Sequence, residues 1–147
     1  MATLTASQVR ERSKNEYNAF LAACPSQKLL STISDKWVTL VLSALGGDGT
    51  QQPGAHCAGE PRMRYSEITR LLAGVSPKML TQTLRKLERD GLIRREVTPT
   101  VPVTVSYELT PLGLSLHEVV RGLKSWAQDH MDAVTAHRTE YDAATTA

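Results

Sequence analysis

The chain has 147 residues, and its 17 lysines and arginines against 15 aspartates and glutamates leave a formal charge of +2. This length fits one domain with helical extensions, and a composition of 41% hydrophobic and 22% charged residues argues against a disordered chain. No apolar run approaches the length of about 20 residues that spans a bilayer. The first twelve residues are polar and lack the apolar centre of a signal peptide, so we expect a cytoplasmic protein.

The positive charge is concentrated in one quarter of the chain. Between Glu60 and Arg95, nine basic residues stand against four acidic ones, a charge of +5, so the rest of the chain carries 2 − 5 = −3. A nucleic-acid phosphate backbone would meet concentrated charge of this kind. A hydrated basic surface would explain the charge equally well, so the interpretation depends on the predicted elements.

The N-terminal part of the sequence predicts helices and then a loop. We expect three helices, over residues 7–22, 25–33 and 35–45. The third is strongly apolar, and its predicted buried stripe has helical spacing: Trp37, Leu40, Val41 and Leu45. Residues 46–61 hold five glycines and two prolines, which predicts a flexible loop longer than compact domains usually contain.

The second half predicts short alternating elements. They are a strand over 63–65, a helix over 67–72 capped by Ser66, a helix over 77–90, strands over 92–97 and 103–109 around a tip at 98–102, and a last helix from Pro111 to about Arg138 before a frayed tail. Ser76 before Pro77 is a strong helix start, because the hydroxyl caps the first turn and proline fits its first position. A short helix, a turn, a basic helix and a hairpin are the order of a winged helix-turn-helix, a mainly α fold with a small β-hairpin (α+β).

The helix over 77–90 separates an apolar side from a basic one. Three leucines form the predicted core stripe: Leu80, Leu84 and Leu87. The opposite arc has no carboxylate and consists of Lys78, Thr81, Gln82, Arg85 and Arg89. Arginine bonds guanine edges and glutamine bonds adenine edges, so this face predicts insertion into the major groove of double-stranded DNA. Further predicted DNA contacts come from the helix starts and the hairpin base: Arg64, Ser66, Ser76, Arg94 and Arg95.

The hairpin tip differs from the rest of this predicted interface, because it carries no charged side chain. Insertion of a wing into a minor groove profits from arginine or lysine. We therefore expect the hairpin to brace the DNA backbone rather than read sequence. An ordinary amphipathic helix with a hydrated face is the alternative reading of the basic helix, and the capped helix before it and the hairpin after it favour DNA.

Taken together, these segments resemble the HxlR family of MarR-like winged-helix transcription regulators. The resemblance lies in Cys24-Pro25, Ile33–Trp37 (ISDKW), Arg64–Ile68 (RYSEI), Val75–Ile93 and Tyr107–Gly113 (YELTPLG). It implies a non-enzymatic homodimer that binds a palindromic operator, with residues 1–23 as a helical extension, 24–113 as the DNA-binding domain and 114–147 as the dimerisation helix and tail. Relative to the family, residues 46–61 are an insertion.

The spacing of apolar residues in the last helix is independent support for dimerisation. Its apolar positions approach a coiled-coil seam: Leu112, Leu116, Val119, Leu123, Trp126, His130 and Val134. Packing of this seam against its own domain is the alternative. The resemblance implies that the N-terminal helix, with Tyr17 and Phe20, joins the same dimer interface.

The two cysteines are candidates for redox sensing. Cys24 precedes Pro25 at a helix start, where the helix dipole favours a thiolate. The resemblance implies that a cysteine in this position responds to oxidants or quinone-like electrophiles, and Cys57 is a candidate partner for a disulfide. A structural role for a buried Cys24, and a small-molecule effector in place of an oxidant, both stay open.

Other site types have little support in the sequence. His56-Cys57 is too sparse for zinc, His130 and His137 lie on one helix face with no carboxylate nearby, and no nucleophile–base pattern or phosphate loop occurs. We therefore expect no catalytic site, no metal site and no cofactor. The alternatives to a DNA-binding repressor are a winged helix that binds protein and a metal-responsive repressor.

Overall fold

The computed structural model describes residues 5–17, 24–47 and 62–146, with the side chains of residues 15–17 left out. These residues form six helices and three strands, so the predicted mainly helical fold with a small β-sheet is confirmed. The chain divides into two compact units, Met1–Thr39 and Leu40–Ala147.

The first unit contains two helices and the start of a third. They are α1 (Ala6–Tyr17), α2 (Pro25–Ile33) and α3 (Lys36–Leu45), which continues into the second unit. Pro25 occupies the first turn of α2 as expected. Asp35 begins α3, because its Oδ1 accepts a hydrogen bond from the Trp37 backbone N–H at 2.9 Å. Residues 18–22 of the first predicted helix lie outside the described residues.

Helix α3 is nearly apolar all round, and the predicted buried stripe is partly wrong. Val41 and Leu45 are fully buried, but Leu40 is 37% exposed and Trp37 is half-buried. The remaining members of the buried face are Val38, Leu42 and Ala44. A run with so few polar residues fits several stripes of helical spacing, so the pattern alone does not select the face.

Three antiparallel strands form one sheet in the order β1-β3-β2. They are β1 (Met63–Arg64), β2 (Ile93–Thr98) and β3 (Thr104–Leu109). Hairpin register pairs Arg94 with Glu108 and Arg95 with Tyr107, while Arg64 pairs with Ser106 on the other side of β3. Because successive strand residues point to opposite faces, Arg94 and Arg95 leave opposite sides of the sheet.

The helix after β1 begins earlier than predicted. Helix α4 spans Tyr65–Leu71, so Tyr65 is helical and Ser66 lies inside the first turn rather than at the cap. Arg64 is the N-cap residue, and Glu67 Oε2 accepts a hydrogen bond from its backbone N–H at 2.7 Å. The acid three residues after the cap, rather than the serine, is therefore what sets the start of this helix.

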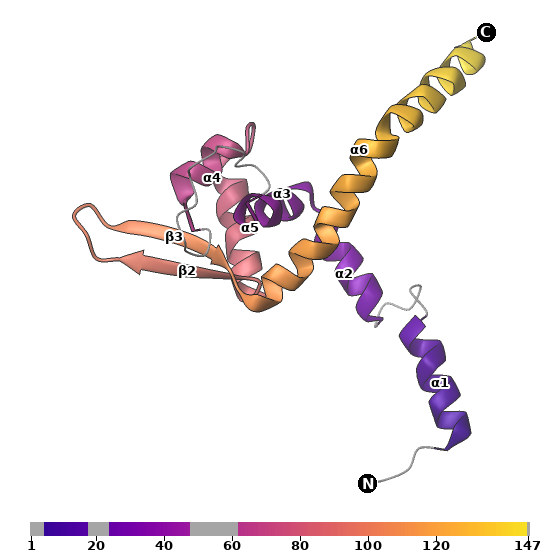
Figure 1. Ribbon diagram of the computed structural model, residues 1–147, viewed down its shortest axis with the longest axis horizontal. Coiled ribbons are helices and arrows are strands. Elements are labelled where there is room, and N and C mark those ends of the chain that lie inside the picture. Colours follow the sequence, from indigo (N-terminus) through magenta and orange to yellow (C-terminus); the bar gives the residue numbers. More distant parts are fainter. Residues whose placement is uncertain (1–4, 18–23, 48–61, 147) are drawn as a thin grey trace. The chain divides into compact units, whose positions relative to one another are not determined.

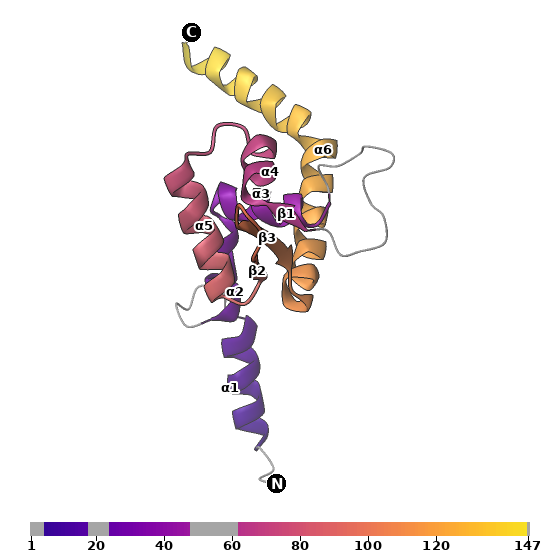
Figure 2. The same ribbon diagram turned by 90° about the vertical axis from the view of Figure 1, so that its left-hand side faces the viewer.

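Helix α5 (Pro77–Arg89) lies against the hairpin in the second unit. Its predicted cap is confirmed, because Ser76 Oγ accepts a hydrogen bond from the Met79 N–H at 3.1 Å. Leu80, Leu84 and Leu87 are buried as predicted. Figures 1 and 2 show α5 beside β2, α4 beside β1 and β3, and α6 leaving the end of β3. A helix, a turn, a basic helix and a wing therefore occur in the expected spatial order.

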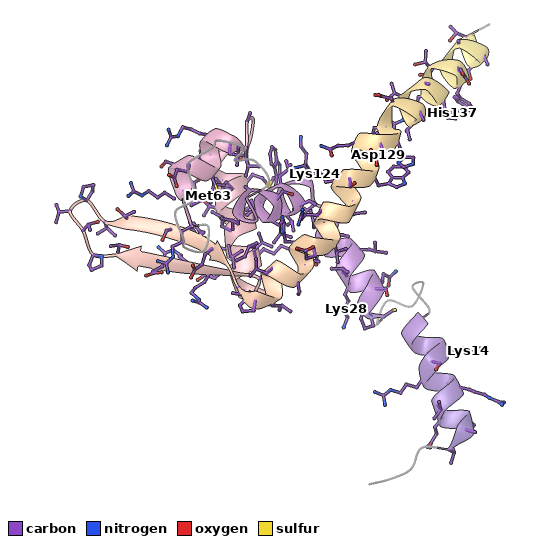
Figure 3. The ribbon with its side chains drawn as sticks, viewed as in Figure 1. Lys14, Lys28, Met63, Lys124, Asp129 and His137 are labelled. Carbon is purple, nitrogen blue, oxygen red and sulfur yellow. The ribbon has the colours of Figure 1, made fainter. Side chains whose placement is uncertain are left out.

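Helix α6 (Pro111–Thr146) has 36 residues, a length of about 54 Å. Only Gly113, His117 and Val120 are buried on it, and Asp129 and His137 mark the long exposed stretch that follows (Figure 3). The predicted end near Arg138 and the frayed tail are wrong. The threonines of the tail donate hydrogen bonds back along the helix, from Thr139 to Thr135 O and from Thr145 to Tyr141 O, which satisfies their hydroxyls in helical form.

Among the described helices, none combines the length and the apolar character needed to cross a membrane.

Candidate nucleic-acid interface

The basic face predicted from the sequence lies on α5 away from the core. Thr81 is half-buried. The other four side chains of this face are exposed: Lys78, Gln82, Arg85 and Arg89. Thr83, on the core side, is buried and donates its hydroxyl to Met79 O at 2.9 Å. The polar groups left at the surface of α5 are therefore mainly cations and one amide.

The cations of this face are not held in ion pairs with other described residues. In the part of the chain that the structure describes, no carboxylate lies within ion-pair distance of Lys78, Arg85 or Arg89. These three side chains are also exposed to solvent and are not engaged by polar groups of other described residues. They are positioned to neutralise an external anion.

The N-terminal turn of α5 adds further donors. Ser76 uses its hydroxyl oxygen as the cap acceptor, which leaves the hydroxyl hydrogen for another partner. Lys78 is exposed in the same turn. The N-terminal end of a helix dipole also favours anions, so this turn suits a phosphate group.

Arg95 is the hairpin arginine that the structure brings next to α5. A hollow of about 530 Å³ lies between α4, α5 and the sheet, and its polar lining is Thr81, Arg85, Glu88 and Arg95. Its remaining walls are Tyr65, Leu84, Val105 and Tyr107. Three of the residues predicted to contact DNA therefore line one concave surface.

Arg94 lies elsewhere, in an ion-pair network. Its Nη1 is 3.2 Å from Glu108 Oε1, and Arg62 Nε is 3.0 Å from the second oxygen of the same carboxylate. The Glu108 side chain is only 3% exposed, and Arg62 also pairs with Glu96 at 2.7 Å. A buried carboxylate needs such partners, so the guanidinium of Arg94 already has a structural role.

Sequence reasoning did not identify this network. The local sequence predicts Glu108 only as a residue of a strand. Its position opposite Arg94 follows from the register of the hairpin. Arg64 and Ser66, two other predicted DNA contacts, are exposed at the start of α4 and outside the lining of the hollow.

The predicted dimerisation seam of α6 is largely open. Leu112, Val119, Leu123 and Trp126 are each more than 50% exposed, and Leu116 is half-buried. The buried face of α6 is instead the one that carries His117 and Val120. Packing against its own unit, the alternative reading, therefore does not cover this seam. Tyr17's side chain and Phe20 lie outside the described residues, so their part in a dimer stays a prediction.

Histidines on α6 have local partners. The His130 ring stacks on Trp126 with 4.7 Å between centroids, and His137 Nδ1 lies 3.9 Å from Glu140 Oε2. The prediction that no carboxylate lies near these histidines is therefore wrong for His137. Within the described ranges, histidine, cysteine and acidic side chains do not gather in groups of three that could hold a metal ion.

Of the two thiols, the structure describes Cys24. It is the N-cap residue of α2 and is 2% exposed. Cys57 lies outside the described residues, so its distance from Cys24 stays open.

Comparison with known proteins places this arrangement in a family. The family model described as HxlR-like helix-turn-helix matches residues 32–135. The Escherichia coli HTH-type transcriptional regulator YtfH is 38% identical over 125 residues, covering 85% of this chain and 89% of the relative. The solved structure titled as transcriptional regulator ytfH from Salmonella typhimurium is 37% identical with a TM-score of 0.67, covering 83% of this chain and 97% of the other.

A second solved structure, titled "Redox regulator HypR in its oxidized form", is 30% identical with a TM-score of 0.60, covering 73% of this chain and 97% of that one. The predicted family, the winged helix-turn-helix fold and a role in transcription regulation are thereby confirmed. The chain belongs to the HxlR-like helix-turn-helix family of transcriptional regulators.

Proposed function

We propose that this protein is a homodimeric, sequence-specific DNA-binding repressor that acts in the cytoplasm without enzymatic activity. The observation that carries the proposal is the exposed face of α5, where no described carboxylate forms an ion pair with Lys78, Arg85 or Arg89 and Gln82 adds an amide. Inserted into a major groove, Arg85 and Gln82 contact base edges, and Lys78 and Arg89 contact base edges or phosphates. Ser76 donates to a phosphate at the helix start.

The hairpin has a supporting role in this proposal. Arg95 lies beside α5 and binds the DNA backbone, whereas Arg94 is left out because Glu108 engages it. Arg64 and Ser66 serve as backbone contacts at the start of α4. The uncharged hairpin tip braces the backbone without reading bases.

Dimerisation follows from the open seam on α6. A second copy of α6 covers Leu112, Val119, Leu123 and Trp126, which the described residues leave exposed. Two α5 helices then lie one DNA turn apart, about 34 Å, and read a palindromic operator. Repression results when the bound dimer blocks access to a promoter.

The base-reading role of α5 predicts the effect of Arg85→Ala. Removing an arginine from a base edge should weaken operator binding by about 1–3 kcal/mol without changing the thermal midpoint. The measurement is a titration of DNA from upstream of the protein's own gene. Arg121→Ala is the matched control, since Arg121 is an exposed arginine on α6 that pairs with Glu118. Equal losses in both variants would show that α5 does not read bases.

Salt dependence separates this function from its alternatives. Phosphate contacts release counterions, so the logarithm of affinity should fall linearly with the logarithm of salt concentration. A winged helix that binds only protein would show no DNA affinity of this kind. A separate titration with zinc or another divalent ion tests the other alternative, because a metal-responsive repressor would change its DNA affinity when the ion is added.

A thiol input at Cys24 is the second part of the proposal, with a small-molecule effector as the other possible input. Its support is the N-cap position of Cys24 on α2 and the similarity to a structure titled as a redox regulator. Because Cys24 is 2% exposed, an oxidant reaches it only when the protein opens locally. The reaction is therefore slower than that of an exposed thiol.

Diamide titration tests the thiol proposal. We expect diamide to change the operator affinity of the wild-type chain and to leave that of Cys24→Ser unchanged. Cys57→Ser is the control: loss of the response there as well identifies a Cys24–Cys57 disulfide, and non-reducing mass analysis detects the bond. A response that persists in Cys24→Ser contradicts a role for this thiol.

A further inference from the structure

Tyr65 connects the two helices of the helix-turn-helix through its hydroxyl group. It is the first residue of α4, yet its Oη lies 3.1 Å from the Pro77 carbonyl oxygen and 3.4 Å from Thr81 Oγ1, both on α5. Thr81 belongs to the basic face of α5 and is half-buried. Tyr65 of α4 therefore contacts Thr81, a member of the proposed DNA-reading face of α5.

Counting hydrogens fixes the direction of these two bonds. A tyrosine hydroxyl has one hydrogen, and a carbonyl oxygen only accepts. Tyr65 must therefore donate to Pro77 O, and its oxygen is left to accept from Thr81. If the Tyr65 hydrogen pointed to Thr81 instead, two acceptor oxygens would face each other at 3.1 Å. Both contacts are favourable only when the Thr81 hydroxyl hydrogen points at Tyr65.

Two neighbouring helical threonines behave differently. Thr69 and Thr83 each donate their hydroxyl to the carbonyl four residues earlier, at 2.9 Å. For Thr81 the corresponding carbonyl belongs to Pro77, which already accepts from Tyr65. The tyrosine thus replaces the usual local acceptor of a helical threonine and turns its hydroxyl toward α4.

We infer that Tyr65 is a positioning residue that makes Thr81 an acceptor-only reader of DNA bases, an inference that depends on the proposed insertion of α5 into the major groove. With its hydrogen directed at Tyr65, Thr81 has only oxygen lone pairs to offer. It accepts from the amino groups of adenine or cytosine on the contacted strand. Guanine and thymine present acceptor oxygens there, as does phosphate, and Thr81 disfavours all three.

Binding-site selection tests the inference. Randomised operator half-sites are selected with the wild type, Tyr65→Phe, Thr81→Val and the double variant. At one position per half-site, the wild type should favour adenine or cytosine over guanine or thymine by roughly twofold to tenfold, the contribution of one hydrogen bond. Tyr65→Phe frees the threonine hydrogen and should abolish this preference at that position alone. In the Thr81→Val background, Tyr65→Phe should change no preference.

Tyr107→Phe is the matched control, because Tyr107 lines the same hollow and is not bonded to Thr81. It should leave the selected sequence unchanged. If Tyr65→Phe weakens every sequence equally, or selects the wild-type sequence, the inference is overturned while the proposed function stands. If the wild type selects no sequence, the proposed function is overturned, and the inference with it.

Discussion

Gly113→Ala is expected to destabilise the second unit, Leu40–Ala147, by about 3 kcal/mol, an overpacking effect. A Cβ built on Gly113 would overlap the Leu92 backbone carbonyl and lie 3.2 Å from Leu109 Cδ2. The carbonyl cannot easily retreat, because it also accepts a hydrogen bond from the Thr110 N–H at 3.1 Å. Helix α6 would have to move away from the base of the hairpin. The measurement is the urea midpoint of unfolding.

Gly122→Ala is the control in the same helix. Nothing lies within 4 Å of a Cβ at Gly122, so the substitution should stabilise α6 by about 0.5–1 kcal/mol through helix propensity. Opposite signs for the two glycines are the expected result. Similar midpoints for Gly113→Ala and the wild type would show that α6 does not approach Leu92 this closely.

Leu123→Glu is expected to abolish dimerisation and to weaken operator binding by roughly 10²–10⁴-fold. Leu123 is 51% exposed at the centre of the α6 seam, and the proposed dimer would bury its carboxylate substitute beside an apolar partner. A monomer binds one half-site and loses the effective concentration that links the two half-sites. Sedimentation gives the oligomeric state, and the same operator titration gives the affinity.

Gln128→Glu provides the matched control for this substitution. It adds the same charge to an exposed position of α6 that lies off the seam. It should leave the dimer intact. A Leu123→Glu chain that sediments as a dimer and binds the operator normally would contradict the proposed interface.

Local signals predicted most of the fold. Pro25 and Ser76-Pro77 mark the starts of α2 and α5 because caps and proline act within one turn. The glycines also lie where expected, with positive φ angles of +89° at Gly74 and +73° at Gly91. The burial of the three leucines of α5 was predictable because the polar residues of that helix lie on the opposite side.

Features that depend on distant parts of the chain could not be predicted in this way. The start of α4 depends on where β1 ends, and that strand of two residues is defined by its pairing with the distant β3. The engagement of Arg94 depends on the register between β2 and β3. The contact of Tyr65 with Thr81 likewise needs the packing of α4 on α5, although both residues stand in the family segments.

The ion-pair network around Glu108 has a consequence for how DNA approaches. Arg62 and Arg94 balance Glu96 and Glu108 on one side of the sheet, two charges against two, so this network has no net charge. On the other side lie Arg95 and the cations of α5, which outnumber Glu88, the carboxylate in the lining of the hollow. This part of the unit is therefore more positive on the α5 side of the sheet, and the field of a DNA molecule would favour approach with α5 first. Orientation before contact raises the association rate, an effect that salt should remove.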